Sequence, residues 1–558
     1  TLCVKALNLF AFFYHAALLS LPFFDFMHDL VQRHSTLTIA LYTDGVVPRN
    51  QIRPDKAGSF EAVRITVCEF PHWLRTRKGL RWIPICYPTH DDMDEHEVTI
   101  SNIVIALLKS WFPSGASRTF ETGIFLRHES RSETVHLKMR FGPMPQDADA
   151  FKHVFSLKGS SGQSPCPWCS NCMFRVPYFE DDSGFAHIHS PMHHKFTRHS
   201  NESFTIMLED LETAEGAARA EHEKVFGLNY QPTELLWCHE VRRHLRFPYV
   251  IYWDHMHCLT ASGGIAQYIV NQMVLRFCAA LKMEVAEWDD FHMKLEGIPR
   301  LRKDFFVTRI VNNSRAHMRG FAADCLSAMT VIGLFILMVV LPKKFTAMNR
   351  EIKCFSHMFI ILQILRRGNP ADLPRLKQEI RLHHLLFIMV FPQCVKPKLH
   401  YALHIPECWE AWGCLLNCYG AEADHRDVCR IFRFSMKKPS DASISHALHG
   451  LLAAVQKWTT FAAVFLIEPV QPCNYEFEDG GERCIMTHTS KQLQAEFVII
   501  RTCDCIAWKN GDVRKCGKAL LFALFHRPTQ DNLVHFGCVV PCHESHPDGW
   551  WHDQGTKI

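Results

Sequence analysis

The sequence predicts an α/β core that is interrupted by a long helical segment and followed by a small β domain. Three observations carry this prediction. Apolar residues alternate with a period of two in several stretches before residue 150, whereas helical spacing dominates from 160 to 390. Short alternating runs separated by turns return over 481–542, after a stretch at 470–480 that is expected to be a linker. A chain of 558 residues with 47% apolar residues is long enough for several domains that each bury a core.

The first expected strand lies within Leu37–Pro48, which reads LTIALYTDGVVP. Apolar residues alternate along it up to Tyr42, and Thr43-Asp44-Gly45 is expected to follow as a polar turn with a carboxylate at its tip. A carboxylate at the end of a buried strand is a common way to hold a metal ion, yet Asp-Gly is also a strong turn signal in its own right. Both interpretations of Asp44 stay open on this stretch alone.

The elements after this strand follow a definite order. Further strands are expected at Ala62–Phe70, Arg81–Tyr87 and Thr134–Phe141, with a helix at Glu97–Trp111. Asp147 and Asp149 then precede a short helix at Ala150–Leu157. This succession, in which aspartates follow the first and fourth strands, is the opening order of the ribonuclease-H-like fold. In that fold two adjacent strands bring the carboxylates close enough to share divalent metal ions.

The predicted domain organisation follows from these elements. Residues 1–36 are expected to form a helical segment, 37–160 the first part of the core, 161–395 a Cys-containing turn with a helical insertion, 396–470 the last part of the core, and 481–558 the β domain. A membrane-spanning helix needs ~20 consecutive apolar residues. The run Leu7–Phe24 is interrupted by Asn8 and His15, and the run Leu326–Leu341 is too short. Buried helices and no membrane association are therefore expected.

Charge and cysteine usage narrow the class of protein. The net charge of +4 excludes a uniformly basic nucleic-acid binder, so DNA binding would need local clusters. The candidate clusters contain Arg75, Arg77 and Lys78, Arg242 and Arg243, residues 300–303, and Lys398. Each cluster could equally be an ordinary solvated surface. The 23 cysteines are scattered over a long chain, which indicates mostly free thiols in a reducing compartment.

One local exception to the scattered cysteines is the turn PCPWCSNC. Cys166, Cys169 and Cys172 form two overlapping Cx2C spacings, which place two thiolates on one side of a tight loop, as tetrahedral zinc requires. The other ligands are not evident, because the histidines between 187 and 199 repeat no known zinc spacing. Unmetallated turn cysteines remain the alternative.

Two later stretches combine histidine with carboxylates. Asp254 and His257 are spaced as DxxH after an apolar run, which suits metal binding or a supporting pair, although such a motif is usually structural. His400 and His404 lie four residues apart, on one face if the segment is helical, but lack the Glu of the HExxH pattern. Glu422 follows within GAEADHR and is either an acidic ligand or a favourable residue at a helix N-terminus.

Five motifs in order resemble a known family. LYTDGVVP, EFPHWLRTRKGLRWIPICYPTH, KGSSGQSPCPWCSNC, YWDHMH with a following Gly263-Gly264, and KPKLHYALHIP with LNCYGAEADHR are similar to the DDE/D transposases of cut-and-paste DNA transposons. The most similar groups are the CACTA-like (En/Spm) and the Kyakuja–Dileera–Zisupton elements. The resemblance covers residues 37–435, and no single motif carries it alone.

The resemblance implies a ribonuclease-H-like core with a helical insertion and an active site of three carboxylates. The first catalytic Asp falls on Asp44 and the final Glu on Glu422. The second falls on Asp147 by the order of the strands, or on Asp254 by the family's D(2)H signature, with His257 in a supporting role. The implied cofactors are Mg²⁺ or Mn²⁺ and structural Zn²⁺. The implied partners are double-stranded DNA and further copies of the chain, in the nucleus.

Three other interpretations stay open at this stage. The chain could be a domesticated or inactive copy that binds DNA or chromatin without cutting, although every required acidic position is filled. It could be a zinc-dependent hydrolase that uses His400 and His404, or a membrane protein built on its two apolar runs.

Overall fold

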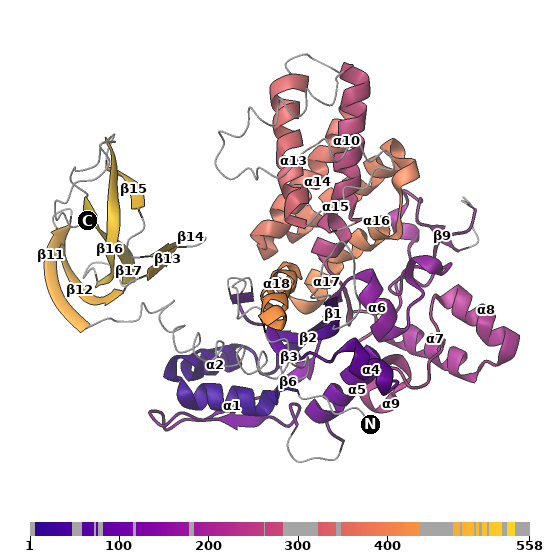
Figure 1. Ribbon diagram of the computed structural model, residues 1–558, viewed down its shortest axis with the longest axis horizontal. Helices are drawn as coiled ribbons and strands as arrows, with labels where there is room; N and C mark the ends of the chain where they lie inside the picture. The colour runs from indigo at the N-terminus through magenta and orange to yellow at the C-terminus, as the bar shows by residue number, and fades with distance from the viewer. Residues whose placement is uncertain are drawn as a thin grey trace. The chain divides into compact units, whose positions relative to one another are not determined.

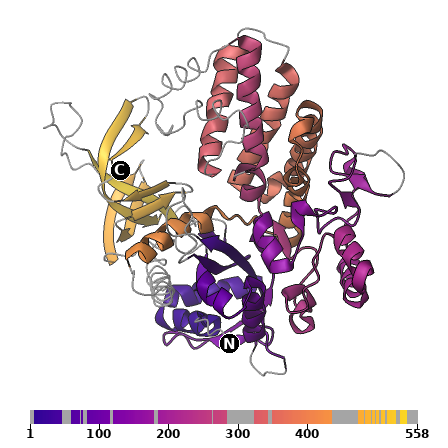
Figure 2. The same cartoon turned by 45° about the vertical axis from the view of Figure 1, so that its right-hand side comes forward.

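The fold is described from a computed structural model (Figures 1 and 2). It describes residues 6–46, 59–71, 74–75, 82–114, 119–177, 184–261, 263–282, 322–341 and 348–434, together with strands between 472 and 541. Two compact units are distinguished, and each is described by itself. Unit 1 comprises residues 1–9, 34–124 and 137–450, and unit 2 comprises 10–33, 125–136 and 451–558. The predicted DNA contacts at Arg77, Lys78 and 300–303 lie outside the described residues.

The centre of unit 1 is a four-stranded mixed sheet with a two-stranded sheet next to it. The four-stranded sheet has the order β3-β2-β1-β6 and consists of β1 (Leu37–Val46), β2 (Phe60–Val67), β3 (Ile83–Cys86) and β6 (Met139–Phe141). The two-stranded sheet consists of β7 (Met144–Gln146) and β10 (Ile251–Trp253). β1 is antiparallel to β2 and parallel to β6, β2 is antiparallel to β3, and β7 is parallel to β10. The amide of Leu41 donates to the carbonyl of Pro143 at 3.1 Å, so β7 continues along β1 beyond the break at Gly142. The predicted α/β class is therefore confirmed.

The first strand is longer than its sequence predicts. Thr43, Asp44 and Gly45 do not turn but continue β1, where Asp44 pairs with Ala62 of β2. The antiparallel ladder extends to the pair Val46–Phe60, whose buried side chains favour continued pairing over the Asp-Gly turn. The strand prediction was correct and the turn prediction wrong, because local turn chemistry gave way to the ladder.

Two helices flank the parallel strands. α5 (Ile100–Trp111) begins at a capping box formed by Thr99 and Asn102 and buries its apolar face. α6 (Ala148–Phe155) begins directly after β7, and Asp147 is its N-cap residue. Both helices lie close to their predicted bounds, because strong periodicity and cap residues coincide in the sequence.

A strand that periodicity did not predict lies inside the helical segment. β10 is only three residues long, so no alternation is visible, and all three of its side chains are buried. The sequence reads there as a continuous apolar run, which does not distinguish a buried strand from a helix. β10 pairs in parallel with β7, with Trp253 in register with Gln146.

Helices make up most of the other described residues of unit 1. Before β10 these are α7 (Asn201–Thr213), α8 (Gly216–Phe226) and α9 (His239–Arg242). After it come the π-helical turn η4 (Met256–Thr260), α10 (Ile265–Leu281), α13 (Ala322–Phe335), η5 (Ile336–Val340), α14 (Asn349–Arg367), α15 (Leu373–Val390), α16 (Pro397–Tyr401) and α17 (Ile405–Trp412). α10, α13, α14 and α15 lie side by side as a bundle (Figure 1). α18 (Tyr419–Phe434) then returns to contact β1.

Unit 2 combines two helices with a β domain. α1 (Leu9–Leu19) and α2 (Leu21–Arg33) are joined to residues 125–136 by an ion pair of Asp25 with Arg131. The carboxyl-terminal strands are β11 (Pro472–Asp479), β12 (Glu482–Ser490), β13 (Gln492–Ala495), β14 (Val498–Arg501), β15 (Cys505–Asn510), β16 (Val513–His526) and β17 (Leu533–Pro541). The predicted linker at 470–480 is wrong, because β11 occupies it and pairs with β12.

The apolar helices were also compared with the length of a membrane span. Within the part of the chain that the structure describes, no single helix is both long and apolar enough to cross a bilayer. The bent pair Leu9–Leu19 and Phe23–Arg33 meets the criteria of length and composition when its two helices are taken together.

Candidate functional site

Two carboxylates that are far apart in the sequence meet beside β1. Asp44 is near the end of β1, and Glu422 is in the first turn of α18. The hydroxyl of Tyr42 donates to Oδ2 of Asp44 at 2.7 Å and lies 3.2 Å from Oε1 of Glu422. His425 is one turn after Glu422, with Nδ1 3.6 Å from Oδ2 of Asp44 and 3.5 Å from Oε2 of Glu422. Both carboxylates are partly exposed, so a ligand can reach them from solvent.

The two other predicted aspartates are also neighbours. Trp253 pairs with Gln146 across the parallel strands β10 and β7, so Asp254 and Asp147 follow them side by side. Asp147 is half-buried, and its Oδ1 accepts hydrogen bonds from the amides of Asp149 and Ala150 at 2.9 and 2.6 Å. Among the described residues, no hydrogen bond reaches Oδ2 of Asp147. This oxygen is therefore available for a ligand.

Asp254 is in a different environment. Its side chain is completely buried. Oδ2 accepts from the amide of His257 at 3.0 Å, and Oδ1 accepts from the amide of Cys418 at 3.1 Å. Hydrogen bonds to the charged form favour ionisation, and the pKa of Asp254 is lowered although burial opposes this. Both of its oxygens are thus engaged by the protein.

His257 connects Asp254 to Glu422. Its Nδ1 lies 2.8 Å from Oδ2 of Asp254, and its Nε2 lies 3.3 Å from Oε1 of Glu422. Burial alone would lower the pKa of this imidazole, but the two carboxylates raise it to about 10. His257 is therefore an imidazolium at neutral pH. It lies in the π-helical turn η4, a local geometry that often occurs at functional sites.

The charges of the cluster are not balanced by the protein alone. Burial raises the pKa of Asp44 well above its ordinary value, and the carboxylates of Glu422 and Asp147 raise it further. Burial also disfavours the charged form of Glu422, but hydrogen bonds from His257 and His425 lower its pKa overall. A divalent cation beside Asp44 would relieve the repulsion and favour its ionised form.

The donor atoms of this region form two groups that fit a metal ion. One group consists of Asp44, Glu422 and His425, and the other of Asp254, His257 and Cys418. Within each group the donor atoms lie within 4.8 Å of one another. The first group is partly exposed and rich in oxygen, whereas the second is buried and already internally paired.

A buried ion pair fixes α18 against the sheet. Arg64 of β2, which pairs with Tyr42 of β1, is 2% exposed. Its NH1 lies 3.2 Å from Oδ2 of Asp424 and donates to the carbonyl of Ala421 at 3.4 Å. Because these two residues flank Glu422, the guanidinium positions the helix turn that carries the carboxylate.

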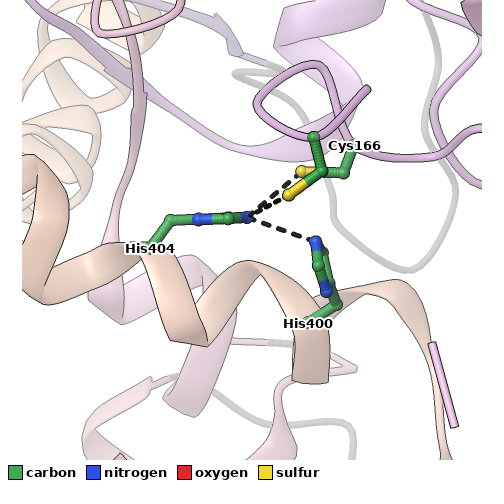
Figure 3. Close-up of side chains that lie close together, drawn as sticks. Cys166, His400 and His404 are labelled. Atoms are coloured by element: carbon green, nitrogen blue, oxygen red, sulfur yellow. Dashed lines mark hydrogen bonds between the residues drawn. The ribbon is translucent and has the colours of Figure 1, made fainter. Parts of the chain in front are cut away.

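A second cluster brings together the Cys-rich turn and the later histidines. Cys166, Cys169, His400 and His404 are all buried, and their donor atoms lie within 4.8 Å of one another. Nε2 of His404 lies 3.2 Å from Sγ of Cys166, 3.6 Å from Sγ of Cys169 and 3.2 Å from Nε2 of His400 (Figure 3). Tetrahedral zinc with sulfur and nitrogen ligands requires donor separations of about 3.3–3.8 Å. This cluster could therefore bind a metal such as zinc.

The surroundings of this cluster also favour a metal. Oε2 of Glu407 lies 2.9 Å from Nδ1 of His404, which leaves Nε2 to face the sulfurs. Arg198 holds the same carboxylate through two hydrogen bonds at 2.9 and 2.8 Å and donates to Sγ of Cys169 at 3.0 Å. Cys172 is buried nearby but is not among the four donors that converge.

The arginines that were predicted to contact DNA have different environments. Arg75 donates to the carbonyls of Phe70 and Leu415 at 2.7 and 2.8 Å, so its side chain has a structural role. NH2 of Arg242 lies 2.8 Å from Nδ1 of His239, and NH1 lies 3.7 Å from Glu212. NH2 of Arg243 donates to Ser114 at 3.1 Å.

Lys398 has the most informative position among the basic residues. It is half-buried on α16, two residues before His400. Burial lowers the pKa of its ammonium group, whereas Asp147 and Asp254 favour its charged form. One short helix therefore contributes a histidine to the Cys/His cluster and a cation near the aspartates.

Three features of the two sites were not evident from the sequence. Tyr42 resembles any buried strand tyrosine, and His425 is one of 35 histidines. The pairing of the Cx2C turn with His400 and His404 spans more than 230 residues and repeats no local spacing. The only available signal was that His425 and His404 lie within the same short motifs as Glu422 and His400.

No protein-family model matches the chain, and no curated protein matches it. The geometry and chemistry of the carboxylate cluster and the Cys/His cluster therefore carry the functional assignment.

Proposed function

We propose that the chain is a DNA transposase of the DDE/D type, which cleaves phosphodiester bonds at transposon ends and transfers the strands with divalent metal ions. The observation that carries this proposal is the convergence of Asp44 and Glu422, which share contacts with Tyr42 and His425. Asp147, which directly follows the parallel strand β7, is near enough to raise the pKa of Asp44.

The topology of the sheet supports a ribonuclease-H-like core. β3, β2 and β1 are antiparallel neighbours, β6 is parallel to β1, and β7 follows β6 in the chain and pairs in parallel with β10 in a two-stranded sheet. Asp44 lies on the first strand, β1. Asp147 directly follows β7, and Glu422 lies on α18, the helix that contacts β1 again after the last core strand. On this proposal, the helices between β10 and α18 form an insertion that begins after Trp253 and not at residue 161 as the sequence predicts.

The residues present fit Mg²⁺ or Mn²⁺, because carboxylate oxygens are the ligands that these hard cations prefer. Asp44, Asp147 and Glu422 would hold the ions. When bound, the ions supply Lewis-acid activation of the attacking hydroxyl and stabilisation of the leaving oxygen. The protein's own part is to orient these ligands. Tyr42 restrains Asp44 and Glu422 together, and His257 restrains Glu422 from the other side.

Asp147 fits the role of second acid better than Asp254 does. One oxygen of Asp147 is unengaged and the residue is half-exposed, whereas Asp254 is completely buried and accepts from two backbone amides. Asp254 instead orients His257 through the contact at Nδ1. The DxxH pair therefore supports the Glu422 side of the site without binding the metal itself.

The Cys/His cluster fits a structural zinc ion. Two thiolates and two imidazoles fill the four positions of a tetrahedral site, and all four residues are buried. A catalytic zinc site keeps one position open for water or substrate. The donor set therefore argues against a zinc hydrolase that uses His400 and His404. On this proposal, zinc joins the turn before β10 to α16, and so fixes Lys398 where it can contact a DNA phosphate near the acids.

The proposal is tested by nicking of duplex DNA in Mg²⁺ or Mn²⁺. Asp44→Asn and Glu422→Gln should each reduce the rate about a hundredfold or more. Glu410→Gln is a matched control, because Glu410 is an exposed acid on α17 that accepts a hydrogen bond from Lys377. Metal-dependent nicking that both site variants retain would contradict the proposal. DNA binding without nicking in the wild type would favour an inactive, transposase-derived DNA-binding protein.

A further inference from the structure

A cavity of about 310 Å³ lies next to the carboxylate cluster. Helices α13 and α14 form one side of it, and the residues between Asn417 and Gly420 form another. Gly420 is two residues before Glu422, and the lining residue His255 directly follows Asp254. The cavity therefore adjoins both the helix turn that carries the final acid and the strand end that carries the DxxH pair.

The lining of this cavity combines aliphatic side chains of α13 and α14 with aromatic faces and hydrogen-bonding groups. Phe359 and Tyr419 contribute rings, Gln363 and Asn417 contribute amides, and Arg366 contributes an exposed guanidinium. Amides can pair with the polar edge of a heteroaromatic ring, and aromatic faces can stack on it. The guanidinium offers a contact for a phosphate.

Two of the lining side chains have defined environments. The hydroxyl of Tyr419 is 2.6 Å from Oγ1 of Thr260, which restrains the tyrosine ring. His255 is 5% exposed, and its Nδ1 lies 4.0 Å from Oδ1 of the buried Asp254. The tyrosine ring therefore has a fixed position in the wall of the cavity.

The size of the cavity limits the ligand. Pockets for drug-sized molecules enclose about 300–1,000 Å³, so this one is at the lower end and suits a single ring system. We infer that it receives one unpaired nucleobase of the DNA strand held at the carboxylate cluster. This inference rests on the proposed function, because that function places DNA at Asp44 and Glu422. Enzymes that modify a base take it out of the stack into a pocket, which shows that a protein cavity of this kind can hold one extrahelical base.

The test compares two duplexes in Ca²⁺, one with a single unpaired adenine and one with an abasic residue at the same bulge. The wild type should bind the adenine bulge about tenfold more tightly, as expected for one stacked base. Thr330→Trp would fill the cavity from α13 and should abolish this preference, and Gln363→Ala should reduce it. Arg367→Ala should keep it, because Arg367 is the exposed neighbour of Arg366 and does not line the cavity.

Equal affinity of the wild type for both duplexes would overturn the inference, as would a preference that Thr330→Trp retains. Binding of free deoxyadenosine monophosphate that Thr330→Trp abolishes, without any preference between the duplexes, would also overturn it and indicate a site for free nucleotides. Nicking of fully paired DNA is measured separately. Asp44-dependent nicking without a base preference refutes only this inference, whereas a base preference without nicking refutes the proposed function alone.

Discussion

Oε1 of Glu422 lies 3.3 Å from Nε2 of His257, and Nδ1 of the same imidazole lies 2.8 Å from Asp254. The imidazolium thus stands between two carboxylates and balances part of their charge. Asp254 is on the far side of the histidine from Glu422, so it acts on the site through His257. Asp147 and Asp254, the two candidates for the second acid, therefore have different predicted roles, which substitutions can distinguish.

Asn substitutions at the two aspartates should have different effects. Asp147→Asn should reduce metal-dependent nicking about a hundredfold or more and leave stability nearly unchanged, because asparagine keeps the oxygen that caps α6. Asp254→Asn should reduce nicking by about 10–100-fold, as expected for a supporting residue, and should also destabilise the fold. Mn²⁺ titration of nicking and chemical unfolding would measure both effects. Full activity in Asp147→Asn would assign the second acid elsewhere.

Metal analysis should find one zinc ion per chain in protein purified without chelators. Cys166→Ser and His400→Asn should lose this zinc, and Cys172→Ser should keep it, because Cys172 is not among the converging donors. Zinc removal should lower the free energy of unfolding by roughly 4 kcal/mol, the gain expected when free zinc exceeds its dissociation constant about a thousandfold. Elemental analysis that finds zinc retained in Cys166→Ser would be incompatible with the four-ligand site.

The buried pair of Arg64 and Asp424 should contribute more to stability than an exposed pair. Arg64→Met should reduce the free energy of unfolding by about 3 kcal/mol, because it removes the guanidinium from a partly buried carboxylate. Adding Asp424→Asn should restore part of the loss. Arg131→Met, which breaks an exposed pair with Asp25, is the control and should have a much smaller effect, because solvent screens an exposed ion pair. Equal losses in the two single variants would refute the role of Arg64.

A buried histidine on α15 should make the protein sensitive to acid. Burial lowers the pKa of His383 to about 3, helped by nearby His357. The unfolded chain, with an ordinary histidine pKa of about 6.5, binds more protons between these values, so stability falls as the pH falls below about 6.5. Between pH 7 and pH 5, the free energy of unfolding of His383→Leu should therefore fall by about 2 kcal/mol less than that of the wild type.

Chemical unfolding at the two pH values measures this difference. His96→Leu is the control, because it makes the same substitution at an exposed histidine. Parallel losses of stability in wild type and His383→Leu would show that His383 does not carry the acid sensitivity.

The sequence predicted the elements that have strong local signals. β1, β2, β3, α5 and α6 were predictable because alternation or helical spacing coincides with caps and turns. β10 was not, because three buried residues leave no periodic pattern. The continuation of β1 through Asp44 depends on pairing with β2, which a local turn signal cannot reveal. β11 was missed for the same reason, since its identity as a strand depends on pairing with β12.

The candidate sites show a similar division. Asp44, Asp147, Asp254, His257 and Glu422 could be named from motifs and their order. Their contacts could not, because His257 and Glu422 are 165 residues apart and meet only through the sheet and α18. The ligands that complete the Cx2C turn were visible as His400 and His404, but only the fold brings the two pairs together.

The central claim, that three carboxylates from distant parts of the chain share divalent metal, is tested most directly by Mn²⁺ anomalous scattering from crystals. We expect Mn²⁺ within about 2.2 Å of carboxylate oxygens of Asp44, Asp147 and Glu422. Asp44→Asn crystals should lose this signal while a zinc signal at Cys166 and Cys169 remains. No Mn²⁺ at Asp44 and Glu422 under saturating metal, with the protein otherwise folded as described, would contradict the account.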